Sequence, residues 1–330
     1  ANPGRATRLF VLGVGVDVNT VMLDRLALEN KGVPAFVRPR ENVEVKVSSL
    51  YRKIRHPVLT DVTLEARGMH AHDLLPASLP DLFRGSELVL AGRYRKGGPV
   101  EFVLGGRSAR YEREFHYTLH AARPGQGLRS DFPARVWATR RIAQLLDAIR
   151  LHKKRDPELV NEIVRLSTKF GILTEYTSFL ADETGVSHSA LAVNANRARK
   201  NLDGLAAREV GGSGWAQSAN QVARRGAARA PKPTSGYFLA TEGDRDVRRV
   251  ELGGVRLVAN RTFYYRGAKI GWVDVDVPDA AKPEEVVTRW SPRFFELLRA
   301  TTRAENARLA QAGPLLLRVQ GRVIRVVDKS

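Results

Sequence analysis

The first fifty-odd residues combine two patterns of apolar positions. Leu9–Gly15 is almost continuously apolar, which is typical of a parallel strand covered on both faces. Asn19 can cap a following helix by accepting a free backbone N–H of its first turn. The apolar stripe of that helix is Met22, Leu23, Leu26 and Ala27. Pro34–Arg38 predicts a second strand, and apolar residues at helical spacing predict a second helix that ends before Pro57. The order is therefore β-α-β-α.

This order is half of a doubly wound parallel sheet, so we predict an α/β fold for residues 1–56. The opening strand is too apolar for an edge strand, because natural proteins avoid long unpaired apolar edges. One of its flanks has no partner upstream in this sequence. We therefore expect that several strands of the same sheet precede Ala1.

The remaining sequence predicts four further segments. Residues 57–123 have a period of two and indicate an antiparallel β-sandwich segment. Residues 124–182 predict a pair of helices and a closing strand at Ile172–Leu180. Residues 183–235 are rich in Ala, Gly and Ser, contain eight Lys/Arg against three Asp/Glu, and indicate a basic linker. Residues 236–330 predict a small α+β module.

The amino-acid composition excludes several classes of protein. The 330 residues include 54 Lys and Arg against 35 Asp and Glu, a formal charge of +19, and no Cys. Disulfide frameworks and thiolate metal sites are therefore excluded. No apolar run reaches the roughly 20 residues of a membrane span, so we expect none. No catalytic constellation is evident, and we expect neither an enzyme nor a small-molecule substrate.

Several stretches, taken together, resemble one protein family. They are Leu12–Gly15, Val18–Asn19, Leu23–Leu26, Val47–Tyr51, Pro57–Asp61, Leu79–Ser86, Trp137–Ile142 and Gly171–Leu180. Their order and spacing are similar to the C-terminal part of bacterial proteins of the inter-alpha-trypsin inhibitor heavy chain type. Those proteins carry a vault/inter-alpha-trypsin (VIT) domain and a von Willebrand factor type A domain. The resemblance covers roughly residues 7–181 and implies a chain truncated within the type A domain.

The resemblance implies a non-enzymatic adhesion or protein-interaction protein of the cell envelope or exterior. In the family, Mg²⁺ or Ca²⁺ at the rim of the type A sheet captures an acidic residue of a protein partner. Its Asp-x-Ser-x-Ser motif is absent from this sequence, so we assign no metal ligand and no cofactor to this chain. Ligands of open α/β sheets bind at the carboxyl ends of the strands, so Asp17 and Asn19 could border the missing site.

Other motifs are weaker. Gly13-x-Gly15 lacks the rest of a dinucleotide fingerprint and is better explained as a tight turn. His70 and His72 could share one face of a strand, but no third ligand is evident. The aromatic residues of 263–272 are explained by packing between adjacent strands.

The positive charge suggests the alternative function, a basic protein that binds nucleic acid or another polyanion through residues 183–235. The candidate contacts are Arg197, Arg199, Lys200, Arg224, Arg225 and Arg229. No nucleic-acid-binding motif accompanies them, and a generally solvated basic surface explains the charge as well.

Overall fold

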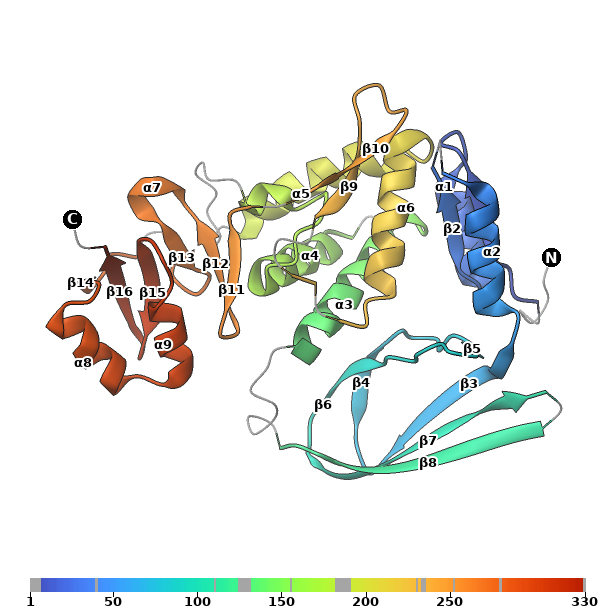
Figure 1. The fold of residues 1–330 in the computed structure, drawn as a ribbon, viewed down its shortest axis with the longest axis horizontal. Coiled ribbons are helices and arrows are strands. Elements are labelled where there is room, and N and C mark those ends of the chain that lie inside the picture. Colours follow the sequence, from blue (N-terminus) through green and yellow to red (C-terminus); the bar gives the residue numbers. More distant parts are fainter. Residues whose placement is uncertain are drawn as a thin grey trace. The chain divides into compact units, whose positions relative to one another are not determined.

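The computed structural model describes residues 7–38, 41–109, 111–123, 132–154, 156–181, 191–229, 231–232, 236–251, 253–278 and 281–328. The chain is mixed α/β and divides into two compact units (Figure 1). Unit 1 consists of Ala1–Lys153, Arg208–Ala230 and Ala240–Arg248. Unit 2 consists of Lys154–Ala207, Pro231–Leu239 and Arg249–Ser330. Each unit is therefore assembled from segments that are far apart in the sequence.

Unit 1 begins with the predicted β-α-β-α order. It comprises β1 (Val11–Val14), α1 (Thr20–Glu29), β2 (Pro34–Val37) and α2 (Val43–Ile54). Strands β1 and β2 pair in parallel, with Val11 opposite Pro34. Asn19 caps α1, since its Oδ1 accepts the backbone N–H of Met22 at 2.8 Å. Within the described residues β1 pairs with β2 alone.

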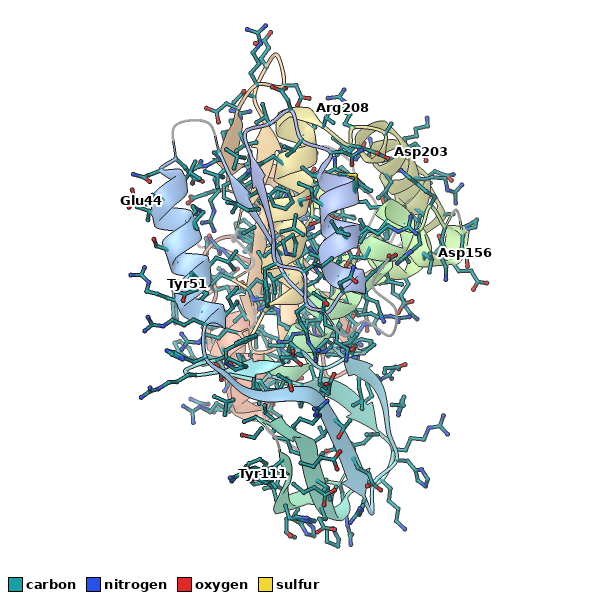
Figure 2. The ribbon with its side chains drawn as sticks, turned by 90° about the vertical axis from the view of Figure 1, so that its right-hand side faces the viewer. Glu44, Tyr51, Tyr111, Asp156, Asp203 and Arg208 are labelled. Carbon is teal, nitrogen blue, oxygen red and sulfur yellow. The ribbon has the colours of Figure 1, made fainter. Side chains whose placement is uncertain are left out.

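Burial in this segment differs from the sequence pattern. Val14 of β1 is exposed, although the continuous apolar run predicted two covered faces. Met22 and Leu26 of α1 are also exposed, and the buried face of that helix is formed by Thr20, Val21, Asp24 and Ala27. Helix α2 has no buried residue at all, and Figure 2 shows Glu44 and Tyr51 on its surface. The elements were therefore predicted correctly, but of the predicted stripe of α1 only Ala27 is buried.

Residues 57–123 form the predicted antiparallel strands. These are β3 (Pro57–Arg67), β4 (Ala71–Leu75), β5 (Leu82–Phe83), β6 (Ala91–Tyr94), β7 (Gly98–Ser108) and β8 (Tyr111–Ala121). One sheet has the order β5-β3-β7-β8, and its long strands curl as they cross the unit (Figure 1). A second sheet pairs β4 with β6. Their arrangement as a sandwich stays a prediction.

Two long helices complete unit 1. Helix α3 (Phe132–Arg150) packs against α6 (Gly211–Arg225), and α6 also contacts α1 and β2. Small residues of α6 allow close packing on α1: a Cβ on Gly214 would lie 2.9 Å from the Thr20 hydroxyl oxygen. The N-terminus of α6 has no cap from Val210, but the Asp244 carboxylate accepts the Ser213 N–H at 2.7 Å.

Unit 2 combines helices with a six-stranded sheet. Its first helices are α4 (Pro157–Phe170), capped by Asp156, and α5 (Leu191–Ala206). The sheet order is β11-β12-β13-β15-β16-β14. Its strands are β11 (Val255–Val258), β12 (Arg261–Tyr265), β13 (Trp272–Asp274), β14 (Glu285–Thr288), β15 (Leu315–Val319) and β16 (Arg322–Val327). Helices α7 (Gly267–Ile270), α8 (Pro292–Ala300) and α9 (Arg303–Leu309) lie between them in sequence, and Phe263, Phe294 and Leu315 are among the core residues.

The linker prediction for residues 183–235 is wrong over most of the part that the structure describes. Residues 191–206 and 211–225 are the helices α5 and α6, and most of α6 is buried. Gly, Ala and Ser are typical of flexible linkers, but they also suit a helix that packs closely on its neighbours. Strands β9 (Tyr237–Ala240) and β10 (Val247–Val250) follow.

Two predictions for residues 124–182 also differ from the structure. Both helices form, but α3 belongs to unit 1 and α4 to unit 2, so they are not one pair. The closing strand is absent, because Ile172–Leu180 forms turns and the start of a short 3₁₀ helix, Ser178–Ala181. Here Thr174 and Thr177 bond to nearby backbone N–H groups at 3.2 and 3.0 Å, a local alternative to strand pairing.

Candidate functional site

The carboxyl end of β1 is the rim at which Asp17 and Asn19 were expected to border a binding site. Gly15 adopts a left-handed φ of 82°, which turns the chain from the strand toward the helix. The Asp17 side chain is exposed on this turn. Asn19 lies at the start of α1, where its oxygen is already used as the helix cap.

A segment from much later in the chain covers this rim. The carbonyl oxygen of Glu209 accepts the Thr20 N–H at 2.9 Å and the Thr20 hydroxyl at 3.0 Å. The Gly211 N–H donates to the Val16 carbonyl at 2.7 Å. The Asn19 amide donates to the Glu209 carboxylate at 3.0 Å, so both ends of that amide have partners within the chain. Of the two predicted rim residues, only Asp17 is left pointing to solvent.

The Glu209 carboxylate is held in its charged form. Lys153 forms an ion pair with it, and this bond, followed by that from Asn19, lowers the pKa of Glu209 below its ordinary value. The Lys153 ammonium group and the Asn19 amide therefore already contact the two oxygens of this carboxylate. No three His, Asp or Glu side chains of the described residues gather as a metal site requires, and this includes His70 and His72. The rim does not fit the divalent cation that the resemblance implies.

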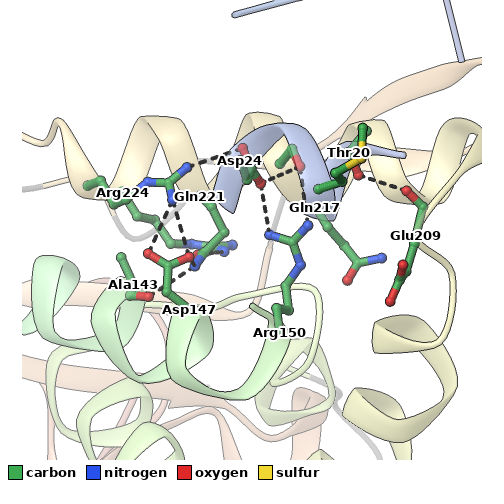
Figure 3. A network of polar contacts seen from close by, with 12 residues as sticks. Thr20, Asp24, Ala143, Asp147, Arg150, Glu209, Gln217, Gln221 and Arg224 are labelled. Atoms are coloured by element: carbon green, nitrogen blue, oxygen red, sulfur yellow. Dashed lines mark hydrogen bonds and ion pairs between the residues drawn. The ribbon is translucent and has the colours of Figure 1, made fainter. Parts of the chain in front are cut away.

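A buried network of charged and polar side chains lies beneath the rim and joins α1, α3 and α6 (Figure 3). Arg150 and Asp24 are 1% and 0% exposed, and Arg150 Nη1 lies 3.4 Å from Asp24 Oδ2. The Ser218 hydroxyl donates to the same oxygen at 2.6 Å and accepts Arg150 Nη2 at 3.2 Å. The guanidinium group thus reaches α1 and α6 together.

Arg225 extends the network to a second carboxylate. Its Nη1 donates to Asp147 Oδ2 at 3.2 Å, and its Nη2 lies 3.6 Å from Asp24 Oδ1. The Gln221 amide donates to Asp147 Oδ1 at 2.9 Å. Burial raises the pKa of Asp147, while the charge of Arg225 and the bond from Gln221 oppose that rise. These groups bind one another in the interior, so the arrangement acts as a structural clamp between three helices.

The six basic residues proposed for polyanion binding do not form one exposed cluster. Arg224 is buried and donates to Gln221, and Arg225 belongs to the ion network. Arg197, Arg199 and Lys200 lie on α5 in unit 2, and Arg229 follows α6 in unit 1. Arg197 stacks on the ring of Phe179, with 5.7 Å to the ring centroid. The proposed cluster is therefore wrong for Arg224 and Arg225.

Comparison of the sequence with known proteins finds similarity to inter-alpha-trypsin inhibitor heavy chains. No protein-family model matches it. The inter-alpha-trypsin inhibitor heavy chain H4 of Homo sapiens is 28% identical over 191 residues, covering 52% of this chain and 20% of that protein. Heavy chain H3 of Rattus norvegicus is 29% identical over 181 residues, with coverage of 52% and 20%. Heavy chain H2 of Sus scrofa is 25% identical over 202 residues, with coverage of 56% and 21%.

Over about half its length the chain is inter-alpha-trypsin inhibitor heavy chain-like. This confirms the resemblance predicted from the motifs of residues 7–181. The heavy chain-like match spans only about a fifth of each of these relatives.

The residues that organise the site were not identified from the sequence. Asp24, Arg150 and Glu209 were not singled out, since isolated charges are usually exposed. One signal was available: Thr20, Asp24 and Ala27 share a face of α1 at helical spacing, and this is the face of the helix that is buried. Finding their partners required the tertiary structure, since Ser218 is 194 residues from Asp24.

Proposed function

We propose that the chain is a non-enzymatic adhesion or protein-interaction protein of the cell envelope or exterior. The match to inter-alpha-trypsin inhibitor heavy chains over half the chain is the observation that carries this proposal. In this proposal residues 1–56 are the C-terminal half of a von Willebrand factor type A domain. The β-α-β-α order and the parallel pairing of β1 with β2 support this assignment.

Asp17 is the rim residue that meets a protein partner in this proposal. It is exposed on the turn after β1, whereas Asn19 is bonded to Met22 and Glu209. Metal-mediated capture, which the resemblance implies for the family, is not part of the role proposed for this chain. Titration with Mg²⁺ or Ca²⁺ in a calorimeter is therefore expected to give no micromolar isotherm. Clear binding of Mg²⁺ or Ca²⁺ would contradict the conclusion that the rim at the carboxyl end of β1 does not fit a divalent cation.

The proposed location rests on analogy with the heavy chains. Among the described helices, none is long and apolar enough to cross a membrane. We expect the protein to be reachable from outside intact cells that produce it. A membrane-impermeant cross-linker applied to such cells tests location and protein binding together.

The expected result is a cross-linked species of the chain with another polypeptide, recovered without lysing the cells. An Asp17→Asn variant should give less of this species, because the substitution removes only the charge of an exposed side chain. Glu242→Gln, at another exposed carboxylate of unit 1, is the matched control and should leave the yield unchanged. Labelling of the chain only after lysis would contradict the proposed location.

A further inference from the structure

Strand β8 is a long, open edge of the curled sheet. Its eleven residues pair with β7 from Tyr111 opposite Ser108 to Ala121 opposite Gly98. In the described part of the chain no strand pairs with its other flank. Alternate backbone N–H and C=O groups therefore point outward along the strand, and such an edge is a template for another strand.

The two faces of β8 differ in chemistry. Tyr111, Tyr117 and Leu119 share one face with Phe115, and they are 73%, 52% and 57% exposed (Figure 2 labels Tyr111). The opposite face carries Glu112, Glu114, His116 and His120. Successive side chains of a strand point to opposite faces, so an apolar row and a polar row with two Glu and two His run along the same edge.

The apolar row continues into a groove on the same face of the sheet. The cavity has a volume of about 290 Å³, and its lining includes Leu59, Leu82, Leu104, Phe115 and Tyr117. Arg113 also lines it and brings a positive charge to this apolar surface. Arg113 lies opposite Gly106 in the pairing with β7, so it has no side chain beside it on that strand.

We propose that the β8 edge and this groove bind an extended segment of another protein, which adds to the sheet as a further strand. Its apolar side chains enter the groove, and one carboxylate among them pairs with Arg113. Basic side chains on its other face lie beside Glu112 and Glu114. Main-chain hydrogen bonds supply affinity in this mode of recognition, and the alternate side chains supply specificity.

The charges favour a different protein over a second copy of this chain. Two copies of β8 paired edge to edge would place apolar row beside apolar row, and that row contains Arg113 but no acid. In such a pair, neither copy would offer a carboxylate to the Arg113 side chain of the other copy. The inference deepens the proposed protein-interaction role and rests on it, but it concerns the sheet and not the rim at Asp17.

The probe is a fluorescein-labelled synthetic peptide of the order Lys-Val-Lys-Glu-Lys-Val-Lys-Val-Lys, and its binding to the whole chain is measured by fluorescence anisotropy. Its alternation matches the two rows of β8. One control peptide has the same composition without alternation, and another is N-methylated at every second residue to remove backbone donors. We expect saturable binding of the first peptide and at least about tenfold weaker binding of both controls.

Matched variants locate the binding to the groove. Tyr117→Gln removes an exposed ring of the apolar row. Thr118→Gln also introduces Gln, but at the next residue, whose side chain lies on the opposite face of the strand. Tyr117→Gln should weaken binding by about tenfold, and Thr118→Gln by less than about twofold. Both side chains are exposed, so unchanged circular dichroism and melting curves will confirm that each variant is folded.

The charge pairing is tested by a double-mutant cycle. Arg113→Gln in the protein, or Glu→Gln in the peptide, should each weaken binding by about fivefold, and the combination should weaken it no further. Equal binding of the N-methylated peptide, or no effect of Tyr117→Gln, would overturn the proposal. Self-association of the chain that Tyr117→Gln abolishes would also overturn it and identify a second copy as the occupant. Cross-linking to a partner on intact cells could still succeed in either case, so the two failures are distinguishable.

Discussion

Replacing Arg150 with Met tests the buried clamp between α1, α3 and α6. The substitution keeps an unbranched apolar stem and removes the guanidinium, which lies 3.4 Å from Asp24 and 3.2 Å from Ser218. Asp24 then stays fully buried, and the Ser218 hydroxyl at 2.6 Å and Arg225 at 3.6 Å remain beside its carboxylate. The loss of one partner of a buried pair leaves a poorly compensated charge.

Breaking a buried ion pair costs about 3–5 kcal/mol of unfolding free energy. Arg225 still lies near Asp24, so we expect the lower end, about 3 kcal/mol, for Arg150→Met. In hydrogen exchange this corresponds to roughly 150-fold faster exchange of the most protected amides of α1, α3 and α6. Urea unfolding followed by circular dichroism gives an independent value.

A matched control lies on the surface of α1. Arg25 and Glu29 form an ion pair at 2.8 Å, but their side chains are 57% and 41% exposed. Arg25→Met should therefore change stability by no more than about 0.5 kcal/mol. Combining Asp24→Asn with Arg150→Met should cost about 2 kcal/mol less than the sum of the single losses. The reasoning is refuted if Arg150→Met shifts stability no further than Arg25→Met.

Two further substitutions probe the segment that covers the rim. The pKa of Glu209 is lowered from its ordinary value of 4.5, chiefly by Lys153, so its stabilising effect is complete above that value and is lost as the pH falls through the folded-state pKa. The stability difference between the wild type and Glu209→Gln should accordingly shrink when urea unfolding is repeated from pH 7 down to pH 3. Asp244→Ala removes the remote cap of α6 and should cost about 1–2 kcal/mol, measured by exchange of the first amides of that helix. Glu242→Ala, at an exposed neighbour, should change stability by less than about 0.5 kcal/mol, and an equal loss from both would contradict the capping role.

Much of the fold was predictable because helix and strand ends depend on neighbouring residues. Asn19 caps its helix as its position indicated, and Asp156 and Ser291 likewise accept a backbone N–H in the first turns of α4 and α8. Gly171 ends α4 in the left-handed conformation with φ 61° that favours glycine. The parallel pairing of β1 with β2 also follows from the β-α-β order.

The candidate site was less predictable, because its contacts join residues that are distant in the sequence. Asp17 and Asn19 lie between β1 and α1, and Glu209, which bonds to Asn19, is 190 residues away in the sequence. From the sequence, Arg224 and Arg225 were expected to be surface charges of a basic linker. In the structure they belong to α6, a helix most of whose residues are buried. Composition describes which residues a segment contains, and it does not reveal what packs against them.

The sequence by itself determined the kinds and order of most elements, the helix caps and the resemblance to the heavy chains. Only the tertiary structure decided which face of α1 is buried, that α6 is a packed helix, and that α3 and α4 belong to different units. The physical reason is the separation along the chain of the residues that interact. Capping and periodicity act within a few residues, whereas burial of Asp24 depends on Arg150 and Ser218, which lie 126 and 194 residues further along the chain.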